Sequence, residues 1–153
     1  MTKRSLSYWI ATLGGIGRFP VAPGTAATIA VGFPAVFVLG FFPQWTVFLA
    51  AACVTVLGCI ASTAAEREIG TRDPGEIVID ELAGFLVAVA GHPVALKPVL
   101  LGFFFFRLYD IWKPWPLRLL QDRLNAGTAV MMDDIGAGIY ANLSIWVVLA
   151  FWK

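Results

Sequence analysis

Charged side chains are scarce in this sequence. Only 14% of its 153 residues are charged and 59% are hydrophobic, whereas a typical soluble domain has about 25% charged and about 45–50% apolar residues. This composition indicates a membrane protein, and the length allows one domain covering residues 1–153. The net charge of +1 and the lack of a dense Lys/Arg cluster argue against a nucleic-acid partner.

Histidine and cysteine are also rare, which excludes several kinds of catalysis. His92 is the only histidine, and it is expected in a turn on the side away from the acidic residues, where it is a poor general base. Cys53 and Cys59 lie in one apolar run, at a spacing that suggests neither a disulfide nor a metal site. Neither is followed by the arginine of a cysteine phosphatase loop. The Ser-Gly-His of histidine-dependent membrane phosphatases and the spaced aspartates of CDP-alcohol phosphotransferases are missing as well.

Long apolar runs predict an all-α fold, a polytopic membrane helical bundle. About four to five membrane helices are expected, over residues 26–42, 45–65, 77–90, 94–112 and 135–152. Residues 5–13 are too few to span a bilayer and predict an N-terminal half-helix or interfacial segment, with the N-terminus retained. Residues 117–125 predict an amphipathic interfacial helix. Loops are expected at 17–25, 66–76 and 127–132, and Thr25 is expected to cap the helix after the first loop.

The distribution of charge predicts the orientation in the membrane. With the N-terminus inside, only Lys97 and Lys153 of the eleven Lys and Arg residues fall on the far side. The positive-inside rule makes the side rich in Lys and Arg cytoplasmic. All ten acidic residues fall on that same side. Chemistry is therefore expected at the cytoplasmic leaflet.

Acidic residues enter the predicted spans at this cytoplasmic end, in three clusters: Asp73/Glu76/Asp80/Glu81, Asp110, and Asp133/Asp134. An ionised carboxylate at the centre of a bilayer costs about 2.5–3.5 kcal/mol on insertion scales, so such residues persist where they hold a cation, a proton or a substrate. A simpler explanation is that Asp133 and Asp134 cap a helix N-terminus. Glu66, Glu68 and Asp122 are expected to be solvated. Asp80 and Glu81 lie inside a span, where the simpler explanation is weak.

Carboxylates from three helices without a histidine form an oxygen-rich site, which suits Mg²⁺ better than zinc. Basic residues are placed to bind phosphate: Arg18 in the glycine-rich loop, Arg107 before Asp110, and Lys113 after it. The alternatives are ion pairs with the acids or snorkelling to lipid headgroups. For Arg107 the sequence favours ion pairing and phosphate binding equally.

A cation or proton transporter could use the same acidic residues. A transporter needs polar groups that reach both faces, however, and the outer half of every predicted span is essentially free of ionisable residues. A small assembly subunit, in which the acids pair with the arginines, is a third hypothesis. The sequence leaves a homo-oligomer open.

Four blocks of the sequence closely resemble the phosphatidylglycerophosphatase A family. They are GRFPVAPGT (17–25), IVIDE (77–81), RLYDIWKPWP (107–116) and MDDIGAG (132–138), and they occur in the order of the family. The resemblance implies a Mg²⁺-dependent lipid phosphatase of the bacterial inner membrane, with its active site facing the cytoplasm. It implies that phosphatidylglycerophosphate loses its terminal phosphate and becomes phosphatidylglycerol.

The same resemblance implies roles for particular residues. The catalytic candidates are Asp80, Glu81, Asp110 and Asp134, the metal ligands are Asp80, Glu81, Asp110, Asp133 and Asp134, and the substrate-binding candidates are Arg18, Thr25, Arg107, Lys113 and Asp73. Glu76 is expected to contact these residues without binding the metal or the substrate itself. Attack by water and an aspartyl-phosphate intermediate both remain open.

Overall fold

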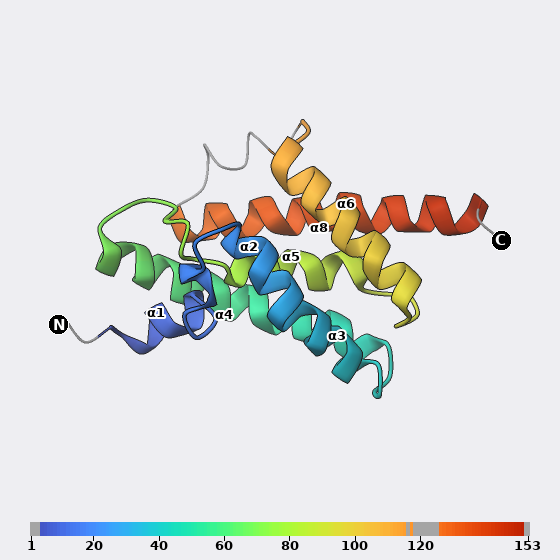
Figure 1. The fold of residues 1–153 in the computed structure, drawn as a ribbon, viewed down its shortest axis with the longest axis horizontal. Coiled ribbons are helices and arrows are strands. Elements are labelled where there is room, and N and C mark those ends of the chain that lie inside the picture. Colours follow the sequence, from blue (N-terminus) through green and yellow to red (C-terminus); the bar gives the residue numbers. More distant parts are fainter. Residues whose placement is uncertain (1–3, 116, 118–125, 152–153) are drawn as a thin grey trace.

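The computed structural model describes residues 4–115, 117 and 126–151, and the regular secondary structure in this part of the chain is entirely helical (Figure 1). The elements are α1 (Leu6–Ala11), η1 (Ile16–Arg18), α2 (Pro23–Ala27), η2 (Thr28–Gly32), α3 (Phe33–Leu39), α4 (Trp45–Ile69), α5 (Ile79–Val89), α6 (Leu96–Trp112) and α8 (Ala126–Phe151). The expected all-α fold is thus confirmed for the described residues. The expected helix at 117–125 lies almost wholly outside them.

Helix α5 forms the centre of the bundle, and α4, α6 and α8 pack around it (Figure 1). Nine of its eleven residues are buried, which explains why its sequence after Glu81 is apolar all round rather than on one face. Glycines allow α5 and α8 to touch backbone to backbone, because a Cβ added at Gly138 would lie 2.3 Å from the carbonyl oxygen of Gly84. This close packing brings the acidic start of α5 next to the acidic pair on α8.

Two helices in the described part of the chain are long and apolar enough to cross a membrane, Trp45–Ile69 and Gly127–Phe151. Helix α5 has 11 residues and α6 has 17, fewer than the roughly 20 that a full crossing takes. The apolar helical segment Pro23–Leu39 is also short. The expected four to five membrane helices are therefore not confirmed. Two apolar helices are nevertheless consistent with a membrane protein.

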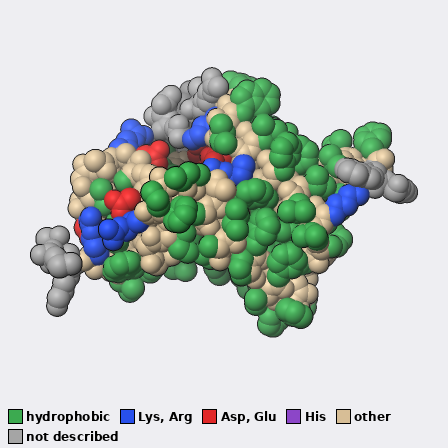
Figure 2. Space-filling model, in the orientation of Figure 1, with side chains coloured by type: hydrophobic (Ala, Val, Ile, Leu, Met, Phe, Trp, Pro, Cys, Tyr) green, Lys and Arg blue, Asp and Glu red, His purple; other side chains and the backbone are tan. Residues whose placement is uncertain are grey.

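The outer surface of the bundle agrees with contact to lipid. Figure 2 shows hydrophobic side chains over much of the visible face, with most of the charged ones gathered at its upper left. Leu57 and Ile60 on α4, and Leu143 and Val147 on α8, are each more than half exposed. Soluble monomers rarely expose contiguous apolar surface on this scale.

The expected end of α4 and the expected start of α8 are wrong, and so is the simpler explanation for Asp133 and Asp134. Residues 127–132 are not a loop, because α8 begins at Ala126. Gly127 instead allows α8 to pack closely against α4, since a Cβ there would lie 2.4 Å from the backbone nitrogen of Thr63. Asp133 and Asp134 consequently lie inside α8 and do not cap its N-terminus. The connection expected from residue 66 starts later, where Gly70 in the left-handed conformation ends α4.

The N-terminal segment is close to what the sequence predicts. A short helix, α1, forms within residues 5–13, capped by the Ser5 side chain, which accepts from the Tyr8 backbone N–H. The expected cap at Thr25 is wrong, because α2 already begins at Pro23 after Ala22. Proline at the first helical position has the required φ and no N–H to leave unsatisfied.

Candidate active site

Eight of the ten predicted site residues gather in one pocket of about 250 Å³ at the N-terminal end of α5. Its charged lining consists of Asp73, Asp80, Glu81, Arg107, Asp110, Lys113, Asp133 and Asp134. Ala22, Pro23 and Gly24 form another wall, together with Gly75, Ile77, Val78 and Val130. The pocket therefore joins segments of the chain that are more than 100 residues apart, and all four of the sequence blocks quoted above contribute to it.

Two predicted residues do not line this pocket. Arg18 is exposed at the end of η1, and Thr25 lies inside α2. Both belong to the glycine-rich block, but it is the backbone around Gly24 that reaches the pocket wall. The predicted substrate contacts of Arg18 and Thr25 are thus without support in the geometry.

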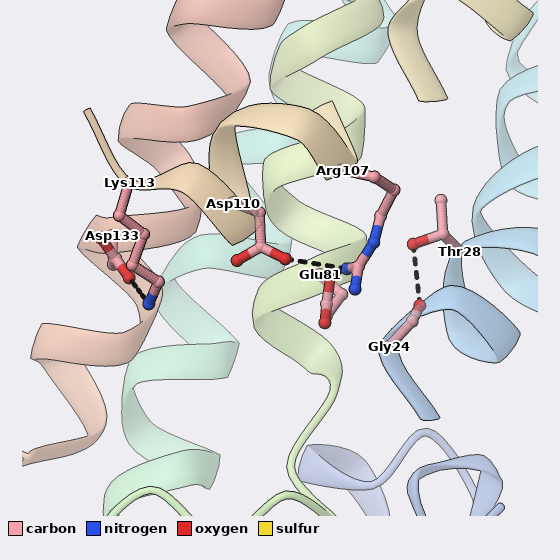
Figure 3. A network of polar contacts seen from close by, with 7 residues as sticks. All are labelled: Gly24, Thr28, Glu81, Arg107, Asp110, Lys113 and Asp133. Atoms are coloured by element: carbon pink, nitrogen blue, oxygen red, sulfur yellow. Dashed lines mark hydrogen bonds and ion pairs between the residues drawn. The ribbon is translucent and has the colours of Figure 1, made fainter. Parts of the chain in front are cut away.

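Arg107 joins the acids of two helices (Figure 3). Its guanidinium donates to Glu81 on α5 and lies 3.0 Å from Asp110 Oδ2, one turn further along α6. The Nε–H of Arg107 is buried and has no hydrogen-bond partner within the described structure. Ion pairing, one of the two roles expected for Arg107, is confirmed, and phosphate binding stays a prediction.

Lys113 makes a second ion pair at the opposite side of Asp110 (Figure 3). It ends α6 in the left-handed conformation, with φ +47°, and its Nζ donates to Asp133 on α8. Burial lowers the pKa of the Lys113 ammonium, but its contact with Asp133 and the charges of Asp110 and Asp134 outweigh that effect, so the net pKa is raised. Lys113 therefore stays positively charged at neutral pH.

Asp80 and Asp134 are buried acids of the pocket that each carry an unsatisfied oxygen. They are 6% and 5% exposed, and Asp80 Oδ1 and Asp134 Oδ2 have no hydrogen-bond partner among the described residues. A buried carboxylate without a partner is costly. Two such groups facing one pocket are residues that could hold a cation.

A test of fit to Mg²⁺ gives a mixed result. The donors are all oxygens, as Mg²⁺ requires, and the pocket lining has six acids against two bases. Within the described ranges, however, no ready-made group of three or more His, Cys, Asp or Glu side chains could hold a metal ion. The residues fit Mg²⁺ in type and charge, and Asp80 and Asp134 each supply an unsatisfied oxygen.

Sequence reasoning missed the roles of three residues in or behind the pocket wall. Glu66 was expected to be solvated, yet it is only 6% exposed and accepts a hydrogen bond from the Asp73 backbone at 3.0 Å. Had α4 been extended to Ile69, Glu66 would fall on the buried face that includes Ser62, four residues earlier. The side chain of Tyr8 and the backbone of Gly24, described below, carried no such signal.

Comparison with known protein families gives a match over nearly the whole chain. A family model described as Phosphatidylglycerophosphatase A matches residues 9–149. The chain belongs to the phosphatidylglycerophosphatase A family. The match leaves out only the first 8 and last 4 of its 153 residues, so it includes every residue that lines the pocket.

Individual relatives cover most of the chain as well. Phosphatidylglycerophosphatase A of Haemophilus influenzae is 31% identical over 139 residues, covering 90% of this chain and 85% of that protein. Phosphatidylglycerophosphatase A of Escherichia coli is 30% identical over 143 residues, covering 90% and 80%. A Bacteroides thetaiotaomicron protein named "Putative phosphatidylinositol-3-phosphatase" is 31% identical over 149 residues, covering 91% and 93%. No solved structure matches the chain.

Membership of the phosphatidylglycerophosphatase A family makes the chain a phosphatase and supports action on lipid. The resemblance predicted from the four sequence blocks is confirmed. The transporter and assembly-subunit hypotheses are not favoured by any of these comparisons.

Proposed function

We propose that the pocket removes the terminal phosphate of phosphatidylglycerophosphate to give phosphatidylglycerol, with Mg²⁺ as cofactor, at the cytoplasmic leaflet of the bacterial inner membrane. The observation that carries this proposal is that Asp80 and Asp134, both buried and each with an unsatisfied oxygen, face the same pocket as Arg107 and Lys113. The names of two relatives support the substrate.

Asp80 and Asp134 would hold Mg²⁺, with Glu81, Asp110 and Asp133 as the further predicted ligands. When bound, the ion would polarise the phosphoryl oxygens and lower the pKa of a bound water. The excess of acids in the lining would otherwise repel an anionic phosphate, so a cation is needed for binding as well as for chemistry.

The two basic residues act on the phosphoryl group itself. Arg107 is held by Glu81 and Asp110, which fixes its guanidinium, and its buried Nε–H is a donor that a phosphoryl oxygen could satisfy. Lys113 adds a positive charge on the other side of Asp110. Preorganised donors of this kind stabilise the charge that develops during phosphoryl transfer.

Aromatic residues near Lys113 support a position at the membrane surface. Trp112 is 60% exposed and Trp115 is 79% exposed, and they flank the lysine that lines the pocket. Tryptophan is enriched where a bilayer meets water. A pocket at this level would reach a headgroup phosphate while the acyl chains stay in the bilayer.

The proposal is tested by phosphate release from phosphatidylglycerophosphate by the purified protein in detergent. We expect release with Mg²⁺ and none with EDTA. Asp80→Asn should lower kcat by more than about 100-fold, the upper end of what is typical for residues that only support a metal ligand. Glu68→Gln is the matched control, because Glu68 contacts Ser5 and Arg4 outside the pocket.

Two outcomes would contradict the proposal separately. Undiminished release in EDTA would remove Mg²⁺ from the mechanism. The assay also includes phosphatidylinositol 3-phosphate, because the name of the Bacteroides relative refers to that class of lipid. A clear preference for it would replace phosphatidylglycerophosphate as the substrate.

A further inference from the structure

The short helix α1 lies against the loop that leads into α5. Tyr8 of α1 is 1% exposed, and its hydroxyl donates to Glu76 Oε2. At the end of the same helix, the Ala11 carbonyl accepts from the Val78 backbone N–H at 3.0 Å. Two hydrogen bonds therefore connect α1 to residues 76–78, immediately before Asp80.

The turn after α1 touches the same loop from another direction. A Cβ added at Gly17 would lie 1.8 Å from the backbone carbonyl oxygen of Glu76, so the two backbones are in direct contact there. Only glycine permits this approach. Glu76 is thus held through its side chain by Tyr8 and through its backbone by Gly17.

The other end of the loop is fixed by α4. Glu66 Oε1 accepts from the Asp73 backbone N–H at 3.0 Å, and Asp73 has φ +50°, a left-handed conformation that is rare outside glycine. Asp73, Gly75, Ile77 and Val78 all line the pocket. The position of one pocket wall therefore depends on hydrogen bonds made behind it.

We propose that α1 is a positioning element of the phosphatase and Tyr8 its positioning residue, which fixes residues 73–80 through Glu76. The proposal rests on the function proposed for the pocket. Tyr8 does not line the pocket, so it acts through Asp73 and Asp80 and not on the substrate. If Tyr8 or Glu76 lost its side chain, the other would lose this hydrogen bond, and loss of the Glu76 carboxylate would leave the buried Tyr8 phenol unsatisfied.

The ionisation of Tyr8 is consistent with this role. Burial raises the pKa of the Tyr8 phenol, and the hydrogen bond to Glu76 acts in the same direction. The phenol therefore stays protonated at neutral pH and remains a donor. The Arg4 guanidinium lies over the Tyr8 ring, 4.5 Å from its centroid, and covers one face of the ring.

The experiment compares Tyr8→Phe with Tyr109→Phe in the full-length protein. Tyr109 makes a hydrogen bond of the same kind to Ser144 at 2.8 Å, between α6 and α8 and outside the pocket lining. We expect Tyr8→Phe to lower kcat per folded molecule by about tenfold or more, as for other supporting contacts, with KM little changed. Tyr109→Phe should keep kcat near that of the parent.

Variants of Glu76 keep the test decisive if Tyr8→Phe folds poorly. Glu76→Gln retains an acceptor for the phenol and should keep most of the activity, whereas Glu76→Leu removes it and should match Tyr8→Phe. The double variant Tyr8→Phe/Glu76→Leu should be no worse than either single one, since residues that act as a pair are not additive.

An unchanged kcat per folded Tyr8→Phe, an equal loss in Tyr109→Phe, or additive losses in the double variant would each overturn the positioning role. The proposed function fails differently, because the parent protein itself would then release no phosphate from the lipid. The two failures are therefore distinguishable in one set of assays.

Discussion

Arg107 offsets much of the acidity on its side of the pocket, because it contacts Glu81 and Asp110 at once. All three side chains are mostly buried, with 14–17% exposure. Removing one partner of a buried pair typically costs about 3–5 kcal/mol, since it leaves a charge without compensation. The residual exposure of these groups places the expected cost for Arg107→Ala near or below the lower end of that range.

A double variant separates the two roles of Arg107. Arg107→Ala should lower both the unfolding midpoint in detergent and kcat/KM. Glu81→Gln/Arg107→Ala removes the charge left behind, so we expect it to regain most of the lost stability, measured by thermal unfolding, while kcat/KM stays low. If the double variant is as unstable as the single one, the contact with Glu81 is not what makes Arg107 structurally important.

At the residue scale, the sequence predicted which acidic residues lie together better than it predicted which residues are buried. The positions of Asp80, Asp110 and Asp134 next to apolar runs predicted that they would share a site, and they do. Exposure was harder to predict. Glu66 was expected to be solvated and is buried, because its burial depends on how α4 packs against distant segments. Arg18 was expected to bind substrate, and it lies exposed outside the pocket lining.

At the scale of elements, the start of α2 is fitted against α5 with no space between them. A Cβ added at Gly24 would lie 1.6 Å from Glu81 Oε1, and Glu81 is itself held by Arg107. Gly24→Ala must therefore displace the Glu81 carboxylate from this contact. We expect a loss of kcat/KM of about tenfold or more, as for other changes to the support of a site.

Gly75→Ala is the matched control for this prediction, measured in the same phosphate-release assay. Gly75 lines the same pocket, but a Cβ there would meet nothing within 4 Å. Its activity should stay close to that of the parent. Equal losses in both variants would mean that the pocket tolerates no added methyl group and that the contact between Gly24 and Glu81 has no special importance.

Glycine is also the reason that some helix boundaries could not be predicted. Gly127 and the small residues after it resemble a loop in sequence, but in the structure Gly127 allows α8 to touch α4. A glycine required for packing between helices and a glycine that breaks a helix are indistinguishable until the partner helix is known. The apolar run of α4, which contains a single glycine, Gly58, was located to within a few residues.

At the scale of the whole molecule, α4 gives a direct test of orientation. Its 25 residues extend about 37 Å at 1.5 Å per residue, more than the roughly 30 Å hydrocarbon core of a bilayer. Gln44, just before α4, and Gly75, in the loop after it, are both exposed. If α4 crosses the membrane, these two positions lie on opposite sides.

We therefore expect opposite labelling of Gln44→Cys and Gly75→Cys by a membrane-impermeant maleimide, in a background with Cys53→Ala and Cys59→Ala. Gln44→Cys should react in right-side-out spheroplasts, and Gly75→Cys only in inside-out vesicles. Each variant serves as the control for the other, because both change an exposed residue in a segment that flanks the same helix. Labelling of Gly75→Cys in spheroplasts would place the pocket at the outer leaflet and contradict the predicted orientation. Labelling of both positions from one side would show that α4 does not cross the bilayer.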